Sequence, residues 1–467
     1  MPIKLNVKPM ELNFNITHYA LRLTPWLWRL AIFLLPWQIR WFSVTPIIGG
    51  YPWEQGRLSL YVSWVVIVIF VIFVILAKAG IQSDRPSVDR MDPRVSAPLR
   101  TRMTRLMLFA IACLVFPSLF SVFPRATFQW WLEIFMLSGF VWALVRLKIS
   151  ARSLATWFII SLIPHVLLAF HQYATQMVIG STWLGMAIQN PLTSGVSVIL
   201  HNGDRILRVY GGFPHPNIFG GWLAVALPFI VWLTVQTKRR AEKIVWMIVG
   251  AAFTIALVLT FSRAAWLAGF VGLLFTSIFC HSCGGRNPSD GSPGLAATRP
   301  RMTKQFLLSF TIIFLAASLT AFFEREYIFV RLDANQGLEQ KSINERQSSF
   351  QQGWSLFLQH PLIGVGPGAT AYAMQSQIIP HFVPLLILDE VGLVGVIGLI
   401  ILIFQIPLLA KERLGEVWAM VWYVAPLLLL SLLDHYPWSL WSGRTLVALV
   451  VAFFILGLDK EHQRRLF

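Results

Sequence analysis

Four basic side chains on separate segments could act together on an anionic ligand. They are Arg208, Arg263, Arg346 and His381, and each lies in or beside a stretch that connects long apolar runs. Arginine forks bind phosphate oxygens in a bidentate manner and stabilise a leaving negative charge. A histidine can lose its proton near neutral pH and then accept one from a hydroxyl group. This set suits a lipid-borne diphosphate and a hydroxyl nucleophile, and such permanent cations would make a metal ion unnecessary.

Two of these residues also have a structural interpretation. Arg263, in Thr260-Phe-Ser-Arg-Ala-Ala-Trp266, stands between two apolar runs with almost no loop. Its guanidinium could extend to lipid headgroups or bind an anion. His381 directly precedes another apolar run and could contact headgroups instead of serving as a base. The residues alone leave both alternatives open.

Arg346 belongs to a predicted amphipathic helix. Phe350, Trp354 and Phe357 follow at helical spacing, which indicates one apolar stripe. Arg346 occupies the same stripe one turn earlier. We therefore expect it to point toward the membrane domain, where a cation needs an anionic partner.

A segment rich in glycine and proline leads into another apolar run. Arg205 and Arg208 lie just before Tyr210-Gly-Gly-Phe-Pro-His-Pro-Asn-Ile-Phe-Gly-Gly221. His215 is fixed between two prolines, and the backbone amides at this helix start would face an incoming anion. The alternative is a simple turn in which Asn217 caps the helix.

Acidic side chains also fall within or beside the apolar runs. Glu133, Asp389 and Glu390 lie inside such runs, and Asp434-His435 precedes the last run with Arg444 beyond it. Charges at this depth are costly and are usually paired or functional. We interpret Glu390, Asp434 and His435 as pairing or pocket-lining residues.

The composition excludes several classes of protein. Of 467 residues, 56% are hydrophobic and only 13% are charged, whereas soluble chains carry about 25% charged residues. A soluble enzyme, a disordered chain and, with three cysteines, a secreted disulfide scaffold are therefore excluded. The net charge of +17 does not indicate nucleic acid, because its distribution suggests orientation in a bilayer.

Apolar runs of spanning length predict an all-α membrane protein, with residues 1–467 forming one polytopic domain. Most Lys and Arg residues fall on one side if both termini are cytoplasmic. Twelve transmembrane helices are expected, at 25–42, 58–77, 106–124, 128–145, 153–171, 217–236, 244–261, 264–282, 305–323, 382–409, 416–433 and 445–459.

The connecting segments differ in character. Residues 172–216 form an expected outer loop, and residues 324–381 form a large extracytoplasmic loop that holds the amphipathic helix. Residues 283–304 are rich in Gly, Pro, Ser and Arg, which is typical of a flexible linker, here on the cytoplasmic side. Cys280 and Cys283 are an isolated CxxC pair, and two cysteines alone cannot supply the four ligands of a structural zinc site.

In order and spacing, these motifs resemble the O-antigen ligase family, which also includes O-antigen polymerases. The resemblance covers residues 205–400, and one position departs from it, since Phe382 follows the histidine where the family often has Asn. The matching stretches are Arg208 with Gly-Phe-Pro-His215-Pro-Asn217, Ser262-Arg263-Ala-Ala-Trp266, Arg346 through Trp354 to His360-Pro-Leu-Ile-Gly-Val-Gly366, and His381 with Glu390-Val-Gly392.

The resemblance implies a GT-C-like glycosyltransferase in the bacterial inner membrane. Such an enzyme moves a glycan from undecaprenyl diphosphate to a hydroxyl of a glycolipid or other glycan acceptor, with inversion and without a metal or cofactor. By the same resemblance Arg208 and Arg263 would hold the diphosphate, Arg346 would be a third contact, and His381 would be the base.

Alternatives remain at this stage. The motifs do not separate a ligase, which attaches a finished chain, from a polymerase, which joins repeat units. A transporter of a small anion such as bicarbonate is a rival from another class, although transporters place their charges at mid-membrane. A lipid-binding scaffold without turnover is a third possibility. Membrane lipids are expected partners in every case.

Overall fold

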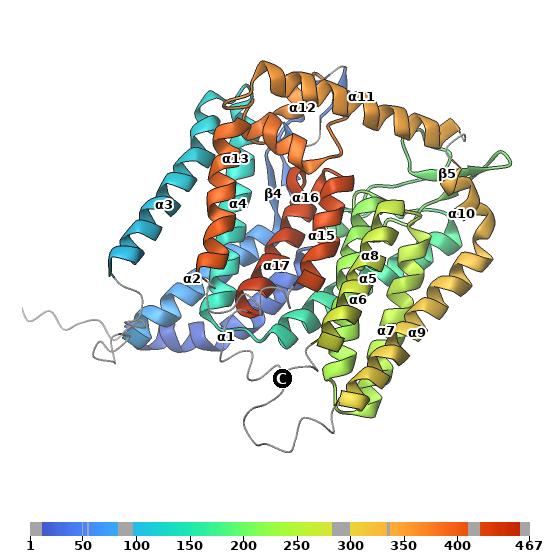
Figure 1. Cartoon of the computed structure of the whole chain (residues 1–467), viewed down its shortest axis with the longest axis horizontal. Coiled ribbons are helices and arrows are strands. Elements are labelled where there is room, and N and C mark those ends of the chain that lie inside the picture. Colours follow the sequence, from blue (N-terminus) through green and yellow to red (C-terminus); the bar gives the residue numbers. More distant parts are fainter. Residues whose placement is uncertain are drawn as a thin grey trace, which may run out of the picture.

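The computed structural model describes residues 12–48, 50–53, 56–82, 97–282, 299–333, 337–409 and 421–457. This part of the chain is mostly helical (Figure 1). The long helices are α1 (Leu12–Leu34), α2 (Val62–Gln82), α3 (Ala97–Val115), α4 (Pro124–Arg146), α5 (Ala151–Thr175), α6 (Pro216–Gln236), α7 (Arg240–Leu259), α8 (Arg263–Ser282), α9 (Arg299–Phe323), α13 (Val383–Leu409), α15 (Val421–Leu433) and α17 (Trp441–Gly457).

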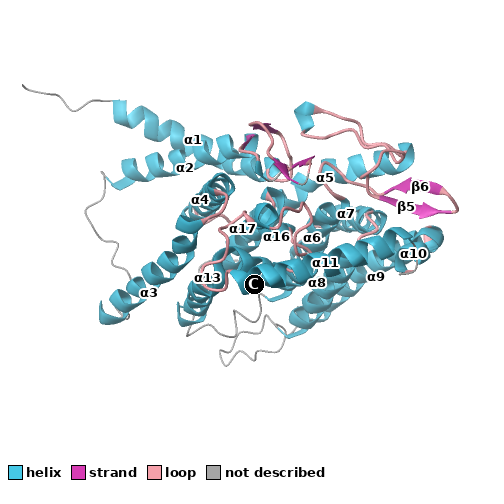
Figure 2. Ribbon diagram, turned by 90° about the horizontal axis from the view of Figure 1, so that it is seen from above, coloured by secondary structure: helices cyan, strands magenta, loops and turns pink. Residues whose placement is uncertain are grey.

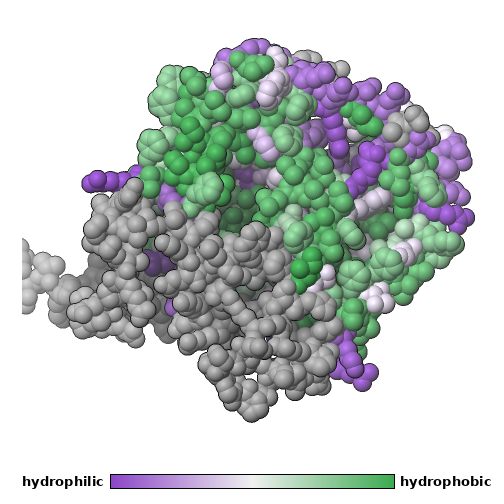
Figure 3. All heavy atoms as spheres, in the orientation of Figure 1, coloured by the Kyte–Doolittle hydropathy of each residue, from purple (hydrophilic) through white to green (hydrophobic). Residues whose placement is uncertain are grey.

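Six of the described helices are long and apolar enough to cross a membrane: α4, α5, α6, α7, α9 from Lys304, and α13 to Gln405. Five shorter apolar helices accompany them within the described ranges. Each expected run contains a helix, but the first one is displaced, because α1 ends at Leu34 and residues 40–42 form a strand. In Figure 3, hydrophobic side chains cover much of the visible flank and hydrophilic ones gather along the upper edge.

Short elements lie at one end of the helical bundle (Figures 1 and 2). The described strands form three two-stranded antiparallel sheets, in which β1 pairs with β4, β2 with β3, and β5 with β6. The remaining elements are the long helix α11 (Gly337–Gln359) and the short α10 (Arg325–Leu332), α12 (Thr370–Ala373), α16 (Tyr436–Ser439), the 3₁₀ helices Phe116–Phe120 and Thr182–Leu184, β1 (Arg40–Phe42), β2 (Ile47–Ile48), β3 (Tyr51–Pro52), β4 (Ser59–Tyr61), β5 (Val198–His201) and β6 (Asp204–Leu207).

Helix α6 is the centre of the core. Its most apolar stretch is 94% buried, and the helix packs against α7, α8 and α15. Glycines permit this approach: a Cβ at Gly220 would lie 2.8 Å from the Cβ of Ala265, and one at Gly221 would overlap the Tyr436 hydroxyl. The Gly220-Gly221 pair at the end of the sequence motif is therefore explained by the close packing of α6 against its neighbours.

Helix α13 is broken at Gly392, whose φ of 60° is left-handed. The loop 361–366 fills the break. Its last two amides donate to the carbonyls of Asp389 and Glu390 (2.8 and 2.9 Å), and its first two carbonyls accept from the two amides after Gly392 (2.9 and 3.0 Å). The loop thus satisfies backbone groups that a break inside an apolar helix would leave unpaired.

The amphipathic helix exists as α11, which lies across the upper end in Figure 1. Arg346 lies close enough to act on His381, as expected, but the aromatic stripe is not the most buried face of the helix. Phe350 and Trp354 are 45% and 48% exposed, whereas Ser349, Gly353 and Leu356 are buried. A Cβ at Gly353 would meet Asp389 Oδ2 at 3.0 Å. The close approach of α11 to α13 requires glycine there, so the small-residue face is buried rather than the aromatic one.

The expected linker is only partly described. Residues 283–298, with Cys283, lie outside the described residues, and so does the side chain of Cys280. Residues 299–304, which we had included in the linker, form the beginning of α9.

Candidate active site

Arg208 follows β6 and is buried, with 5% of its surface exposed. Its Nε donates to the carbonyl of Thr260 (2.8 Å) and its Nη2 to Asn217 Oδ1 (2.6 Å). Burial lowers the pKa of Arg208 to about 10, so the side chain still carries its charge at neutral pH. A fixed cation therefore lies at the N-terminus of α6, the helix end that favours anions.

The tight turn between α7 and α8 holds two arginines. Phe261 adopts a left-handed conformation (φ 49°), and its carbonyl accepts from Nε of Arg331 (2.9 Å), while the preceding carbonyl accepts from Arg208. Arg263 begins α8, and its Nη1 donates to the carbonyl of Arg331 (3.3 Å). The sequence motif Thr260–Trp266 is thus a scaffold for cations from three segments.

Glu339, in the first turn of α11, binds two of these cations. Its carboxylate pairs with Arg263 Nη2 (3.0 Å) and with Arg331 Nη1, and the residue is only 4% exposed. The pairs connect α11 to α8 and α10. Two guanidinium groups are therefore held in place before any ligand arrives, which is the preorganisation that electrostatic catalysis needs.

The arginines also act on one another. Burial, followed by the charges of Arg208, Arg263 and Arg346, lowers the pKa of Arg331. Glu339 pairs with Arg263 and Arg331, and its single negative charge is smaller than the positive charge of the four arginines together. Such a site attracts a ligand that carries more than one negative charge, because each arginine gains from a counter-ion.

Asp434 connects the arginines to a pair of histidines. Its Oδ2 accepts from Asn217 Nδ2 (3.2 Å), and its Oδ1 accepts from the backbone amide of His435 (2.8 Å). The rings of His381 and His435 lie edge to face with centroids 4.9 Å apart. Hydrogen bonds therefore run from Arg208 through Asn217 and Asp434 to the backbone of His435, beside the ring of His381.

Protonation states follow from these neighbours. Burial, assisted by the charge of Arg346, lowers the pKa of His381 despite the opposing effect of Asp434. Burial raises the pKa of Asp434, but the neighbouring His435, His381, His215 and Arg346 together outweigh it, and the net shift is downward. Near neutral pH, His381 is then uncharged and can accept a proton, while the Asp434 carboxylate can stabilise the resulting imidazolium.

His215 is the N-cap of α6. Its Nδ1 accepts from the backbone amide of Asn217 (3.1 Å), and its Nε2 is 2.9 Å from Ser197 Oγ. Burial, followed by the charge of Arg208, lowers the pKa of His215 to about 3. This histidine is therefore neutral, and it caps α6 in place of Asn217, which the sequence had offered as the cap.

One described group could hold a metal ion. His381, Asp434 and His435 offer donor atoms within 4.8 Å of one another. This donor set is of the kind that binds transition metals. The nearby charge of Arg346, which acts on all three residues, opposes a cation there.

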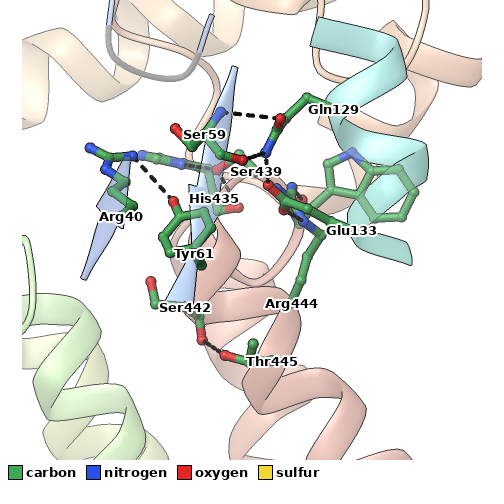
Figure 4. Close-up of polar contacts among 11 residues, drawn as sticks. Arg40, Ser59, Tyr61, Gln129, Glu133, His435, Ser439, Ser442, Arg444 and Thr445 are labelled. Carbon is green, nitrogen blue, oxygen red and sulfur yellow. Dashed lines mark hydrogen bonds and ion pairs between the residues drawn. The ribbon is translucent and has the colours of Figure 1, made fainter. Parts of the chain in front are cut away.

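A second polar region lies beside the histidines (Figure 4). Glu133 accepts from Arg444 Nε (2.8 Å) and from Gln129 Nε2 (2.7 Å). Glu390 accepts from Trp438 Nε1 (2.6 Å) and from Thr370 Oγ1 (3.2 Å). The intramembrane acids Glu133 and Glu390 are thus paired, and Glu390 belongs to this region rather than to the arginine cluster.

The structure places most of the predicted residues together. Glu390 lies in the second polar region, and Arg205 lies apart from both, because its guanidinium binds the carbonyls of Pro191 and Thr193 (3.4 Å to the latter) and stabilises a surface loop. The residues that gather at this end of the bundle are Arg208, Arg263, Arg346 and His381, with His215, Asn217, Asp434 and His435.

Sequence reasoning missed Arg331 and Glu339. Arg331 ends a short polar helix, and Glu339 lies seven residues before Arg346, on the same face of α11. That helical spacing was the available signal, since a charged pair two turns apart faces one direction.

A family profile described as O-Antigen ligase matches residues 248–400. The matched range contains Arg263, Arg331, Glu339, Arg346 and His381. No curated protein matches the chain. The profile match and the apolar helices indicate a multi-pass membrane protein, and they support the assignment of this chain to the O-antigen ligase family that its motifs had indicated.

Proposed function

We propose that the chain transfers a glycan from undecaprenyl diphosphate to an acceptor hydroxyl at the outer face of the bacterial inner membrane. The observation that carries this proposal is the meeting of four arginines and an uncharged histidine at one end of an apolar helical bundle. In this proposal twelve helices span the membrane in a GT-C-like arrangement, with both termini cytoplasmic and the site outside.

The diphosphate would bind Arg208, Arg263, Arg331 and Arg346. The acceptor oxygen then bonds to the anomeric carbon of the glycan as the bond from that carbon to the diphosphate oxygen breaks, with inversion. His381 takes the hydroxyl proton, and undecaprenyl diphosphate leaves with its negative charge stabilised by the arginines. In this step the arginines stabilise the negative charge of the leaving diphosphate, and Asp434 stabilises the positive charge of protonated His381.

The transporter alternative is less well supported. Transporters expose broken helices to a passage at mid-membrane. Helix α13 is broken, but the backbone groups at the break bind the loop 361–366. The buried arginine cluster lies near helix ends instead, at the turn between α7 and α8 and at the start of α6.

The test compares lipid-linked saccharides from cells that carry wild type or His381→Ala, by mass spectrometry. The matched control is His171→Ala, which changes an exposed histidine on α5. Accumulation of long glycans on undecaprenyl diphosphate supports a ligase, and accumulation of single repeat units indicates a polymerase. An unchanged profile with normal protein levels would refute His381 as the base.

A further inference from the structure

A cavity of about 320 Å³ lies beside the histidine pair. Its walls come mainly from β1, β4, the N-terminal half of α4, residues 185–189 and the segment from α16 into α17, and residues of the stretches 210–214 and 368–390 complete them. Most of these segments lie outside the range that matches the O-antigen ligase profile. The volume is that of a small-ligand site.

One part of the wall is aromatic. Tyr61 and Trp441 stack with ring centroids 5.3 Å apart, and Trp53 and Trp130 complete the surface. The indole Nε1 atoms of Trp53, Trp130 and Trp441, and Oγ of Ser442, are buried and have no hydrogen-bond partner among the described residues. Buried donors of this kind are costly when they are left unpaired. A ligand with several acceptor oxygens would supply the missing partners.

The rest of the wall is polar. Arg444 and Gln129 both bind Glu133, and Arg40 Nη1 donates to the Tyr61 hydroxyl (3.2 Å), as Figure 4 shows. Aromatic faces beside fixed planar polar groups match the two kinds of surface on a sugar ring. The C–H faces of the ring pack on aromatic rings, and its hydroxyl groups hydrogen-bond to amides, carboxylates and guanidinium groups.

Two residues of the cavity wall connect the cavity to the histidine pair, whereas Asp434 and Asn217 connect the same pair to Arg208. Ser439 lines the cavity, and its Oγ lies 2.6 Å from Nδ1 of His435. Ile379 also lines it, two residues before His381. Arg208 connects to the same histidine pair through Asn217 and Asp434. The histidines therefore stand between an anion site and a sugar-like site.

We propose that this cavity binds the terminal sugar of the acceptor and presents its hydroxyl to His381. The inference rests on the proposed function, which supplies the need for an acceptor. It adds a location and its residues: the acceptor saccharide is bound mainly by segments from the N-terminal and C-terminal parts of the chain, separate from the four arginines that hold the diphosphate.

The test applies the purified full-length protein in detergent to an array of defined bacterial oligosaccharides. We expect wild type to bind a subset of them. Trp130→Phe and Ser442→Ala each remove one buried donor, and we expect each to bind that subset about tenfold more weakly. Trp157→Phe, on α5 away from the cavity, is the matched control and should bind as wild type does.

Binding of undecaprenyl diphosphate serves as the folding check, because the four arginines proposed to hold the diphosphate do not line the cavity. A photoreactive form of a bound saccharide gives a second readout on wild type, with cross-links expected in the cavity walls, which are β1, β4, α4, residues 185–189 and the segment from α16 into α17. Absence of saccharide binding, unchanged binding by both variants, or cross-links elsewhere would overturn the inference. A normal lipid-linked profile in His381→Ala would instead refute the proposed catalysis and leave saccharide binding intact.

Discussion

Asn217 joins the two halves of the site, and its replacement by alanine is the most informative single change. Its side chain accepts from Arg208 (2.6 Å) and donates to Asp434 (3.2 Å), so Asn217→Ala removes two hydrogen bonds to charged groups. Each such bond is worth about 1.5–3 kcal/mol, or about 3–6 kcal/mol together. Arg208 keeps its bond to Thr260 and Asp434 keeps the His435 amide, so we expect the fold to survive.

The lost energy should appear mainly in the rate. About 3 kcal/mol corresponds to roughly a 100-fold slower transfer, because each 1.4 kcal/mol is a factor of ten. The assay is the rate at which purified protein transfers a lipid-linked glycan, together with its affinity for undecaprenyl diphosphate. The control is Asn190→Ala, which removes an exposed amide that binds only a neighbouring backbone amide in the structure. Transfer at the wild-type rate by a folded Asn217→Ala protein would refute the connection between arginines and histidines.

Three further outcomes are expected. The Arg205→Ala protein should transfer glycan at a rate within about twofold of wild type, because the Arg205 guanidinium binds a surface loop. A large loss of rate would show that Arg205 belongs to the active site. Burial lowers the pKa of His381 from its ordinary value, so the base should stay neutral to a lower pH than a free histidine does. Arg346→Gln removes a charge that lowers this pKa and should therefore move the acid limb of the pH–rate profile to higher pH, and an unmoved limb would contradict this. Chelation with EDTA should leave transfer unchanged, whereas a loss restored by one divalent metal would make His381, Asp434 and His435 its ligands.

The helices could be predicted well from the sequence. Apolar runs of spanning length have few other stable states, because backbone groups within a bilayer must be paired inside the helix. The same physics located the basic residues: a charge such as Arg263 between two apolar runs can only lie near a helix end. The family motifs followed from residue types and their order.

The orientation of α11 could not be predicted in this way. Two faces of the helix, Ser349 with Gly353 and Phe350 with Trp354, differ by a single residue, which is about 100° of rotation. The sequence favoured the aromatic face because apolar area drives burial. The small face is buried because α11 approaches α13 closely at Gly353, and that approach is a property of two helices together.

The positions of the charged residues at the ends of apolar helices follow from the order of residues along the chain. Which of these residues contact one another follows from the packing of the helices. Arg331 and Glu339 pair across two helices, and the cavity draws its walls from residues 40–61, from α4 and from α17. Contacts between different elements leave no periodic signal in the chain, because they depend on how the helices pack and not on any local pattern.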